Sequence, residues 1–318
     1  MKGLEIARKY YETYGAEMIE KNCHDISSQI AVGLVGEGSQ CFGFDDDISK
    51  DHDFAPGFCM WLKEHDFICS GEKLQRAYDC LPDMFCGLSR DNIQDGSRVG
   101  VMSVKGFYRK YLGITDAPKT NRGWLFLRET ALAVCTNGEV FRDELGKFSE
   151  IRKALLGFYP EDVLRKKIAA RAAVMSQAGQ YNLIRCLQRE DNVASMLSVS
   201  RFTESALSMI FLLNRKYMPF YKWAYRSACD LPNLKAAVAK IGELNDMMCS
   251  LHIFGYRKAR DVVFQITEDI CSEVADELNR QGFSDVTSPF LQDHLKDIMI
   301  RIGDSEIRGL PAIYDYGI

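Results

Sequence analysis

Apolar residues recur at alternating steps of three and four through residues 2–28, and this period predicts an opening helix. The short, continuous apolar run at residues 30–35 predicts a buried strand. Residues 52–64 predict a second strand that turns at its Pro-Gly pair, and residues 72–81 predict a helix. Residues 97–113 predict a strand that runs into a helix, so this part of the chain mixes both kinds of element.

The pattern changes about halfway along the chain. Residues 121–148 contain the sequence TNG before a short apolar stretch, which is typical of a hairpin turn. From residue 149 onward prolines become rare, apolar positions recur at three and four, and residues 233–302 continue in the same way. We therefore predict an α+β fold, with a mixed sheet and flanking helices in residues 1–148 and an all-α helical bundle in residues 149–318.

Composition and charge narrow the class of protein. The 318 residues are 47% hydrophobic and 26% charged, which is ordinary for a soluble globular protein, and the length predicts two domains. The net charge is −4 and no run of Lys and Arg is present, which argues against a duplex nucleic acid as partner. A nucleotide stays compatible with this charge, because a metal ion can supply the positive charge.

The cysteines and the N-terminal sequence indicate the cellular compartment in which the protein is expected. The 11 cysteines are scattered and form no CxxC pair, which predicts reduced thiols in a cytosol. The amphipathic N-terminal stretch fits neither a signal peptide nor a transit peptide. No apolar run approaches the roughly 18 residues of a membrane span. The sequence therefore predicts a cytoplasmic protein without a membrane partner.

Candidate chemistry concentrates in residues 36–57, GEGSQCFGFDDDISKDHDFAPG. Asp51 and Asp53 are one residue apart, so on a strand both carboxylates lie on one face, with Cα atoms about 7 Å apart. Carboxylates placed in this way are suitable ligands for Mg²⁺. Gly38 and Ser39 follow the predicted strand and form a turn whose backbone N–H groups can meet a phosphate. Each feature alone is usually an ordinary turn or a polar strand edge, so the combination is what favours a site.

The same stretch resembles a known family. A Gly-Ser turn, a short spacer and Asp-x-Asp on a second strand are similar to the signature of the nucleotidyltransferase superfamily, the group that resembles DNA polymerase beta and includes the aminoglycoside nucleotidyltransferases. More closely, it resembles a bacterial branch of unknown function with Gly-Ser, then Gly-Phe-Asp-Asp, then Ser-x-Asp-His-Asp. The residues that fit this longer pattern are Gly38, Ser39, Gly43, Phe44, Asp45, Asp46, Ser49, Asp51, His52 and Asp53.

The resemblance implies an activity and a set of roles. It implies transfer of a nucleoside monophosphate, AMP from ATP or the corresponding group from another triphosphate, to a hydroxyl of a small-molecule acceptor, with release of pyrophosphate. Gly38 and Ser39 would hold the β and γ phosphates, and Asp51 and Asp53 would be the catalytic pair that binds Mg²⁺.

One part of the family pattern is missing from the predicted strands. The superfamily usually offers a third carboxylate from a later strand, as metal ligand or general base. The strand predicted at residues 98–104, RVGVMSV, contains no Asp or Glu. Asp143, or Asp45 and Asp46, could take that role. This departure keeps two alternatives open, a catalytically impaired nucleotide-binding or regulatory module, and a transferase that modifies a protein or an RNA end.

The helical half contributes one further candidate. Lys222 follows a proline in the stretch FLLNRKYMPFYKWAYRSACDLP, and on a helix it shares a face with Arg226. The stretch resembles a segment in the helical domains of related transferases, in which a lysine reaches the nucleotide phosphates. That resemblance implies a phosphate contact for Lys222 and, more weakly, for Tyr217. Cations that extend over packed aromatics are the ordinary alternative. The acceptor and the oligomeric state stay open.

Overall fold

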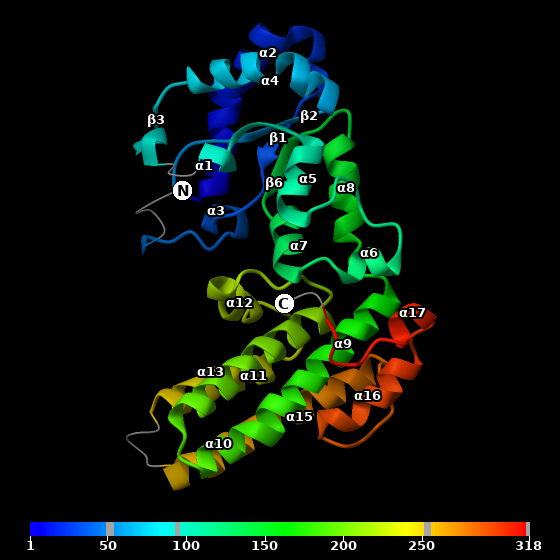
Figure 1. Cartoon of the computed structure of the whole chain (residues 1–318). Coiled ribbons are helices and arrows are strands. Elements are labelled where there is room, and N and C mark those ends of the chain that lie inside the picture. The colour runs from blue at the N-terminus through cyan, green and yellow to red at the C-terminus, as the bar shows by residue number, and fades with distance from the viewer. Residues whose placement is uncertain (49–53, 93–95, 251–255, 316–318) are drawn as a thin grey trace. The chain divides into compact units, whose positions relative to one another are not determined.

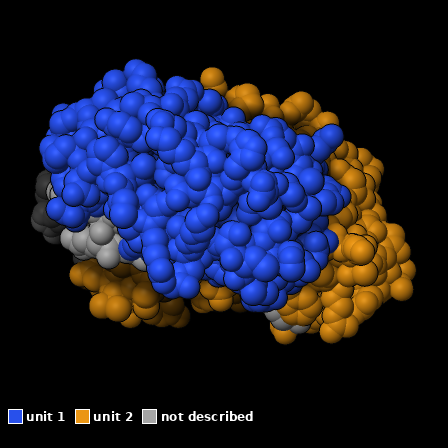
Figure 2. Space-filling view, turned by 90° about the horizontal axis from the view of Figure 1, so that it is seen from above, with its two compact units in different colours: residues 1–117, 131–157 blue, residues 118–130, 158–318 orange. Residues whose placement is uncertain are grey.

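The computed structural model of the chain describes residues 1–48, 54–92, 96–250 and 256–315 (Figure 1). The chain packs into two compact units, coloured separately in Figure 2. Their residues are, for unit 1, Met1–Ala117 and Ala131–Gly157, and for unit 2, Pro118–Thr130 and Phe158–Ile318. The predicted domain boundary after residue 148 stays a prediction, because a division by packing contacts does not define functional domains.

Unit 1 is built around a small mixed sheet, in agreement with the predicted mixture of strands and helices. The strand order is β5-β2-β1-β6, in which β1 is antiparallel to β2 and β6, and β2 is parallel to β5. A separate pair of short strands, β3 and β4, is antiparallel. The bounds are β1 Ala31–Leu34, β2 Cys59–Leu62, β3 Met84–Phe85, β4 Leu88–Ser89, β5 Gly100–Ser103 and β6 Glu139–Arg142.

Helices cover both faces of this sheet (Figure 1). On one face, Phe58 and Met60 pack with Tyr10 and with residues of the helices near the N-terminus and of α4. On the other face, the Trp61 ring stacks on Phe148, with ring centroids 3.9 Å apart. The helices are α1 Gly3–Tyr10, α2 Ala16–Cys23, α3 Ser39–Phe42, α4 Glu64–Asp79, α5 Val104–Leu112, α7 Glu129–Thr136, which spans the unit boundary, and α8 Lys147–Leu156.

The described residues of unit 2 form only helices, with α9 at the centre in contact with α6, α11, α16 and α17. The α-helices are α6 Asn121–Leu125, α9 Glu161–Met175, α10 Ile184–Gln188, α11 Asn192–Leu213, α12 Tyr221–Ala228, α13 Lys235–Cys249, α15 Tyr256–Arg280, α16 Leu291–Ile300 and α17 Ser305–Arg308. A π-helical segment, η6 Ser176–Leu183, continues α9 into α10. The observed architecture is therefore a mixed α/β protein with a small sheet and many helices.

Helix α11 is long and apolar enough to cross a membrane by length and composition alone. Within the folded unit, 67% of its most apolar window is buried. It packs against α9, α10 and α13. That environment is typical of the core helix of a soluble protein, so the helix gives no clear membrane signal.

Several predicted elements have different bounds in the structure. The opening helix is interrupted by a π-helical turn and ends in a 3₁₀ turn. The second strand covers only residues 59–62, because Ala55 and Pro56 form a bend before it. The helix predicted at residues 72–81 begins earlier, at Glu64. The predicted TNG hairpin is wrong, because these residues connect the end of helix α7 to strand β6.

Candidate functional site

The predicted phosphate turn, residues 36–39, follows β1 in unit 1. Gly36 has φ +141° and Gly38 has φ +106°, values in the region that favours glycine. Gly38 precedes the short helix α3, which begins at Ser39. Ser39 is half-buried, and its hydroxyl has no hydrogen-bond partner within the described part of the chain. The turn therefore combines a backbone that requires glycine with a hydroxyl available to a ligand.

Asn137 holds this turn in place. Its side-chain Nδ2 donates to the Gly36 carbonyl at 2.7 Å, and its Oδ1 accepts from the Gly36 N–H at 3.0 Å. The next residue, Gly138, donates its N–H to the Cys41 carbonyl at 2.8 Å. A Cβ on Gly138 would lie 2.0 Å from the Leu34 carbonyl oxygen, so only glycine fits. The TNG sequence therefore positions the glycine turn.

Arg98 lies beside the turn and was not among the predicted site residues. Its Nη1 is 3.9 Å from the position that a Cβ on Gly38 would take. Strand β5 starts two residues later at Gly100, which pairs with Cys59 at the start of β2. An arginine directly before a strand belongs to no recognisable motif, so no sequence signal marks it. The parallel pairing of β5 with β2 brings this cation to the glycine turn.

The acidic candidates divide into two groups. Asp51 and Asp53, the predicted metal ligands, lie outside the described residues. Asp45 accepts a hydrogen bond from the Gly3 N–H at 2.9 Å through Oδ2, and its Oδ1 lies 3.4 Å from the Lys2 ammonium. Its buried carboxylate therefore stabilises the start of α1, an arrangement in which the negative charge also favours the helix dipole.

Asp143, the other suggested source of a third carboxylate, also has structural partners. Its Oδ1 accepts from the Gly146 N–H at 2.9 Å and its Oδ2 from the Ser149 N–H at 2.7 Å, at the start of α8. Across the described ranges, no group of three or more His, Cys, Asp or Glu side chains is arranged to hold a metal. The described residues thus supply a glycine turn and a cation, and Asp45 and Asp143, two of the three suggested replacements, have other roles.

Cys41 sits behind the turn and is buried. Burial raises the pKa of its thiol well above the ordinary value, and the nearby cations Arg98 and Arg152 offset only part of that shift. A thiol in this state is protonated at neutral pH and is a poor nucleophile. All 11 cysteines of the chain are free.

The candidates of the helical half lie in unit 2. Lys222 is exposed on α12, with its ammonium 5.0 Å from the centre of the Trp223 ring. Tyr217 stacks on Phe158 at 4.8 Å and meets Tyr159 edge-on at 5.2 Å. Burial raises the pKa of Tyr217 far above its usual value. Tyr217 is thus part of an aromatic cluster, whereas Lys222 presents its charge to solvent.

Comparison with known families finds one similar domain, over part of the chain. A family model described as a domain of unknown function (DUF4037) matches residues 124–224, about a third of the chain. The matched segment runs from α6 into α12, so it includes Asn137 and Lys222 but begins well after the glycine turn. A comparison with proteins of curated function gives no match. The chain is therefore similar to this domain over its middle third.

Proposed function

We propose that the chain is a Mg²⁺-dependent nucleotidyltransferase that moves AMP from ATP to a hydroxyl of a small-molecule acceptor and releases pyrophosphate. The observation that carries the proposal is the glycine turn at residues 36–39, fixed by Asn137 and flanked by Arg98. A turn with available N–H groups beside a guanidinium is suited to a chain of phosphates.

The strand register supports this reading of the site. Gly33, near the end of β1, pairs with Cys59 at the start of β2, and Cys59 also pairs with Gly100 at the start of β5. The end of β1 and the beginnings of β2 and β5 therefore meet at one edge of the sheet. This arrangement supports a nucleotidyltransferase-like sheet, in which the turn, Arg98 and the segment leading into β2 share one edge.

The proposed roles follow from the chemistry of each group. The N–H groups of Gly38 and Ser39 would bind the β and γ phosphates, and Arg98 would balance their charge. Asp51 and Asp53 offer hard oxygen ligands, which suit Mg²⁺. A bound metal would neutralise charge on the phosphates as the pyrophosphate leaves. Lys222 of unit 2 is proposed as a further phosphate contact.

One observation favours the alternative of a nucleotide-binding module with impaired catalysis. The carboxylates of Asp45 and Asp143, two of the three suggested replacements for the missing third acid, are both engaged by backbone N–H groups of helix starts. A module of this kind would bind ATP and Mg²⁺ without turnover. The free cysteines favour a reducing compartment, so we propose a cytoplasmic location for either function.

Pyrophosphate release from ATP and Mg²⁺, in the presence of a pool of hydroxylated metabolites, tests the proposal. We expect release by the unaltered protein and its loss in the double variant Asp51→Asn plus Asp53→Asn. The matched control, Asp25→Asn plus Asp83→Asn, makes the same charge change at two exposed positions of unit 1 and should release pyrophosphate normally. Binding of ATP without release would favour the impaired module, and absence of Mg²⁺-dependent ATP binding would exclude both.

A further inference from the structure

Helix α9 of unit 2 carries three buried cationic side chains. Lys166, Lys167 and Arg171 are each at most 1% exposed. Charged side chains are rarely buried to this degree unless they are paired. Lys166 satisfies its ammonium on the backbone, because Nζ donates to the Pro311 carbonyl at 2.5 Å and to the Ala312 carbonyl at 2.9 Å. The chain segment 311–315, which we name the strap, therefore lies across the cations.

The strap supplies one carboxylate that bridges the other two cations. Asp315 Oδ1 lies 3.0 Å from the Lys167 ammonium, and Asp315 Oδ2 lies 2.6 Å from Arg171 Nη1. Each oxygen of the carboxylate thus has one cation. The two cations form a receptor for a planar two-oxygen anion, and the strap fills it.

Arg171 would stay in place without the strap. Its Nη2 donates to Glu129 Oε1 at 2.7 Å, and its Nε donates to Ser208 Oγ at 2.6 Å. Ser208 in turn donates to Glu129 at 2.9 Å. These contacts fix the guanidinium from the side away from Asp315. The receptor is therefore held in position by unit 2 itself, which suits a binding site.

Polar contacts, more than apolar burial, attach the strap. Ile313 is 49% exposed and Tyr314 is 44% exposed. Pro311 is exposed as well. Because about half of each of these apolar side chains is exposed, the bonds to the three cations are a main part of the attachment. An anion in solution that satisfies the same cations can compete with such a segment.

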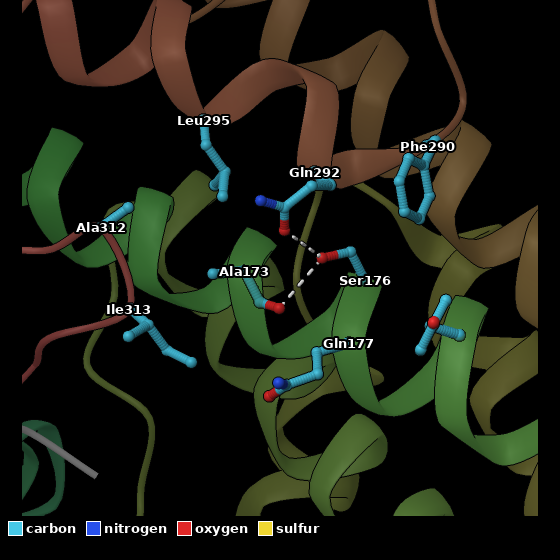
Figure 3. Close-up of a pocket in the computed structure, with 9 residues that line it drawn as sticks. Ala173, Ser176, Gln177, Phe290, Gln292, Leu295, Ala312 and Ile313 are labelled. Atoms are coloured by element: carbon cyan, nitrogen blue, oxygen red, sulfur yellow. Dashed lines mark hydrogen bonds between the residues drawn. The ribbon is translucent and has the colours of Figure 1, made fainter.

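Two pockets flank the strap. One pocket, of about 480 Å³, is drawn in Figure 3, which shows Ala312 and Ile313 on one side and Gln177 below. The second pocket, of about 490 Å³, is lined by Arg171 and Asp315 and has the exposed Arg201 at its wall. Gln177 and Ile313 line both pockets. The strap therefore divides one groove that follows α9 and η6.

We propose that this groove is a binding site for a small organic carboxylate, whose carboxylate takes the place of Asp315 between Lys167 and Arg171. Val174, Ala178 and Leu197 line the second pocket and would accept an apolar body. The strap is then the intramolecular occupant of the site and leaves when the ligand binds. This inference does not depend on the proposed nucleotide chemistry, because all its residues lie in unit 2 and none is assigned to the phosphates.

Hydrogen exchange of the strap amides tests the proposal in the whole chain. Succinate is the probe, compared with sodium chloride at matched ionic strength. We expect succinate to lower the protection of the strap at least about tenfold while α11 stays protected. No response to succinate would overturn the site. A larger response to inorganic phosphate than to succinate would overturn the assignment of a carboxylate ligand.

Two variants and a matched control sharpen the test. Asp315→Asn removes the internal competitor, so it should bind succinate about tenfold more tightly in calorimetry, which corresponds to ~1.4 kcal/mol. Lys167→Met should remove the response to succinate while the protein stays folded, and a full response in this variant would contradict the proposal. Asp269→Asn breaks the Lys240–Asp269 contact of 2.7 Å elsewhere in unit 2, and should leave succinate binding unchanged.

Discussion

The glycine turn of unit 1 and the buried cations of unit 2 are both polar sites, but they are built in opposite ways. In the turn, Gly38 and Ser39 come from one short stretch, and the Ser39 hydroxyl has no partner within the described residues. In the cation cluster, Arg171 pairs with Asp315 far along the chain, and its bonds are filled. A site made from neighbouring residues leaves a motif in the sequence, whereas a site made from distant residues leaves none.

The largest expected effect is on stability, and it comes from removing a buried cation of unit 2. Arg171→Met leaves the buried carboxylates of Glu129 and Asp315 without their shared cation. We expect a loss of about 3–5 kcal/mol in the free energy of unfolding, because unpaired buried charges are strongly unfavourable. Urea unfolding of the variant and the unaltered protein at neutral pH measures this loss.

The control for this prediction is an exposed ion pair. Arg122 and Glu306 of unit 2 lie 2.6 Å apart with side chains that are largely exposed. Arg122→Met should change the free energy of unfolding by less than about 1 kcal/mol, because solvent screens such pairs. Equal effects in the two variants would mean that the cations of α9 contribute no more than surface charges do.

The same contrast explains how far the sequence could predict the structure. The strand at residues 30–35 and the strand-to-helix segment at 97–113 were confirmed, because their apolar periods are local. Trp61 of β2 is buried on one face and Met60 on the other, so no alternation marked where that strand begins. Gly38 and Ser39 became candidates because they directly follow the predicted strand and match the Gly-Ser of the resemblance, and their phosphate role stays a prediction. Their supports, Asn137 and Arg98, depend on pairing between strands far apart in sequence.

Lys166, Lys167 and Arg171 show the limit most clearly. In the sequence EDVLRKKIAARAAVM they have the pattern of a solvated helix face. In the folded unit, contacts with the strap and with Glu129 bury them. These partners lie between 42 and 148 residues away in the chain. Only the tertiary fold distinguishes such a helix from an exposed one.

The next largest effect concerns the support of the glycine turn. Asn137→Ala removes both side-chain hydrogen bonds to Gly36 and should lower the free energy of unfolding by about 1–3 kcal/mol. If the turn holds phosphates, Mg²⁺-dependent ATP binding at a temperature well below the unfolding midpoint should fall as well. Calorimetric titration with ATP and urea unfolding measure the two quantities.

A variant of comparable stability controls for a general loosening. Asn245 of unit 2 also makes two side-chain hydrogen bonds, to Thr203 and to the Ile241 carbonyl. Asn245→Ala should lose a similar free energy of unfolding and keep its ATP affinity. If both variants weaken ATP binding equally, the turn has no special part in it.

Arg98 offers a smaller effect, on ATP binding. Arg98→Gln keeps a polar, unbranched side chain but removes the charge beside Gly38. We expect ATP affinity to fall about tenfold, since a charge-assisted contact with phosphate is worth ~1.4 kcal/mol or more. Arg76→Gln, an exposed position on α4, is the control with the same charge change. An unchanged affinity in Arg98→Gln would remove this residue from the proposed phosphate site.

The smallest effect is a pH dependence of the cation cluster. Burial lowers the pKa of Lys166 to about 8, against an ordinary value of 10.5, and Asp315 opposes the shift. Between these two values the unfolded chain binds more protons than the folded one, so this group makes stability rise with pH from about 8 upward. In Lys166→Met this rise should be lost, while the other titrating groups are unchanged. The difference in unfolding free energy between this variant and the unaltered protein should therefore change between pH 7 and about 10.

A control comes from the glycine turn, which contains no buried ammonium group. Ser39→Ala should show the same pH dependence of stability as the unaltered protein. A constant difference across this range for Lys166→Met would mean that the Lys166 ammonium costs nothing to bury, and that the two backbone carbonyls of the strap replace its hydration fully.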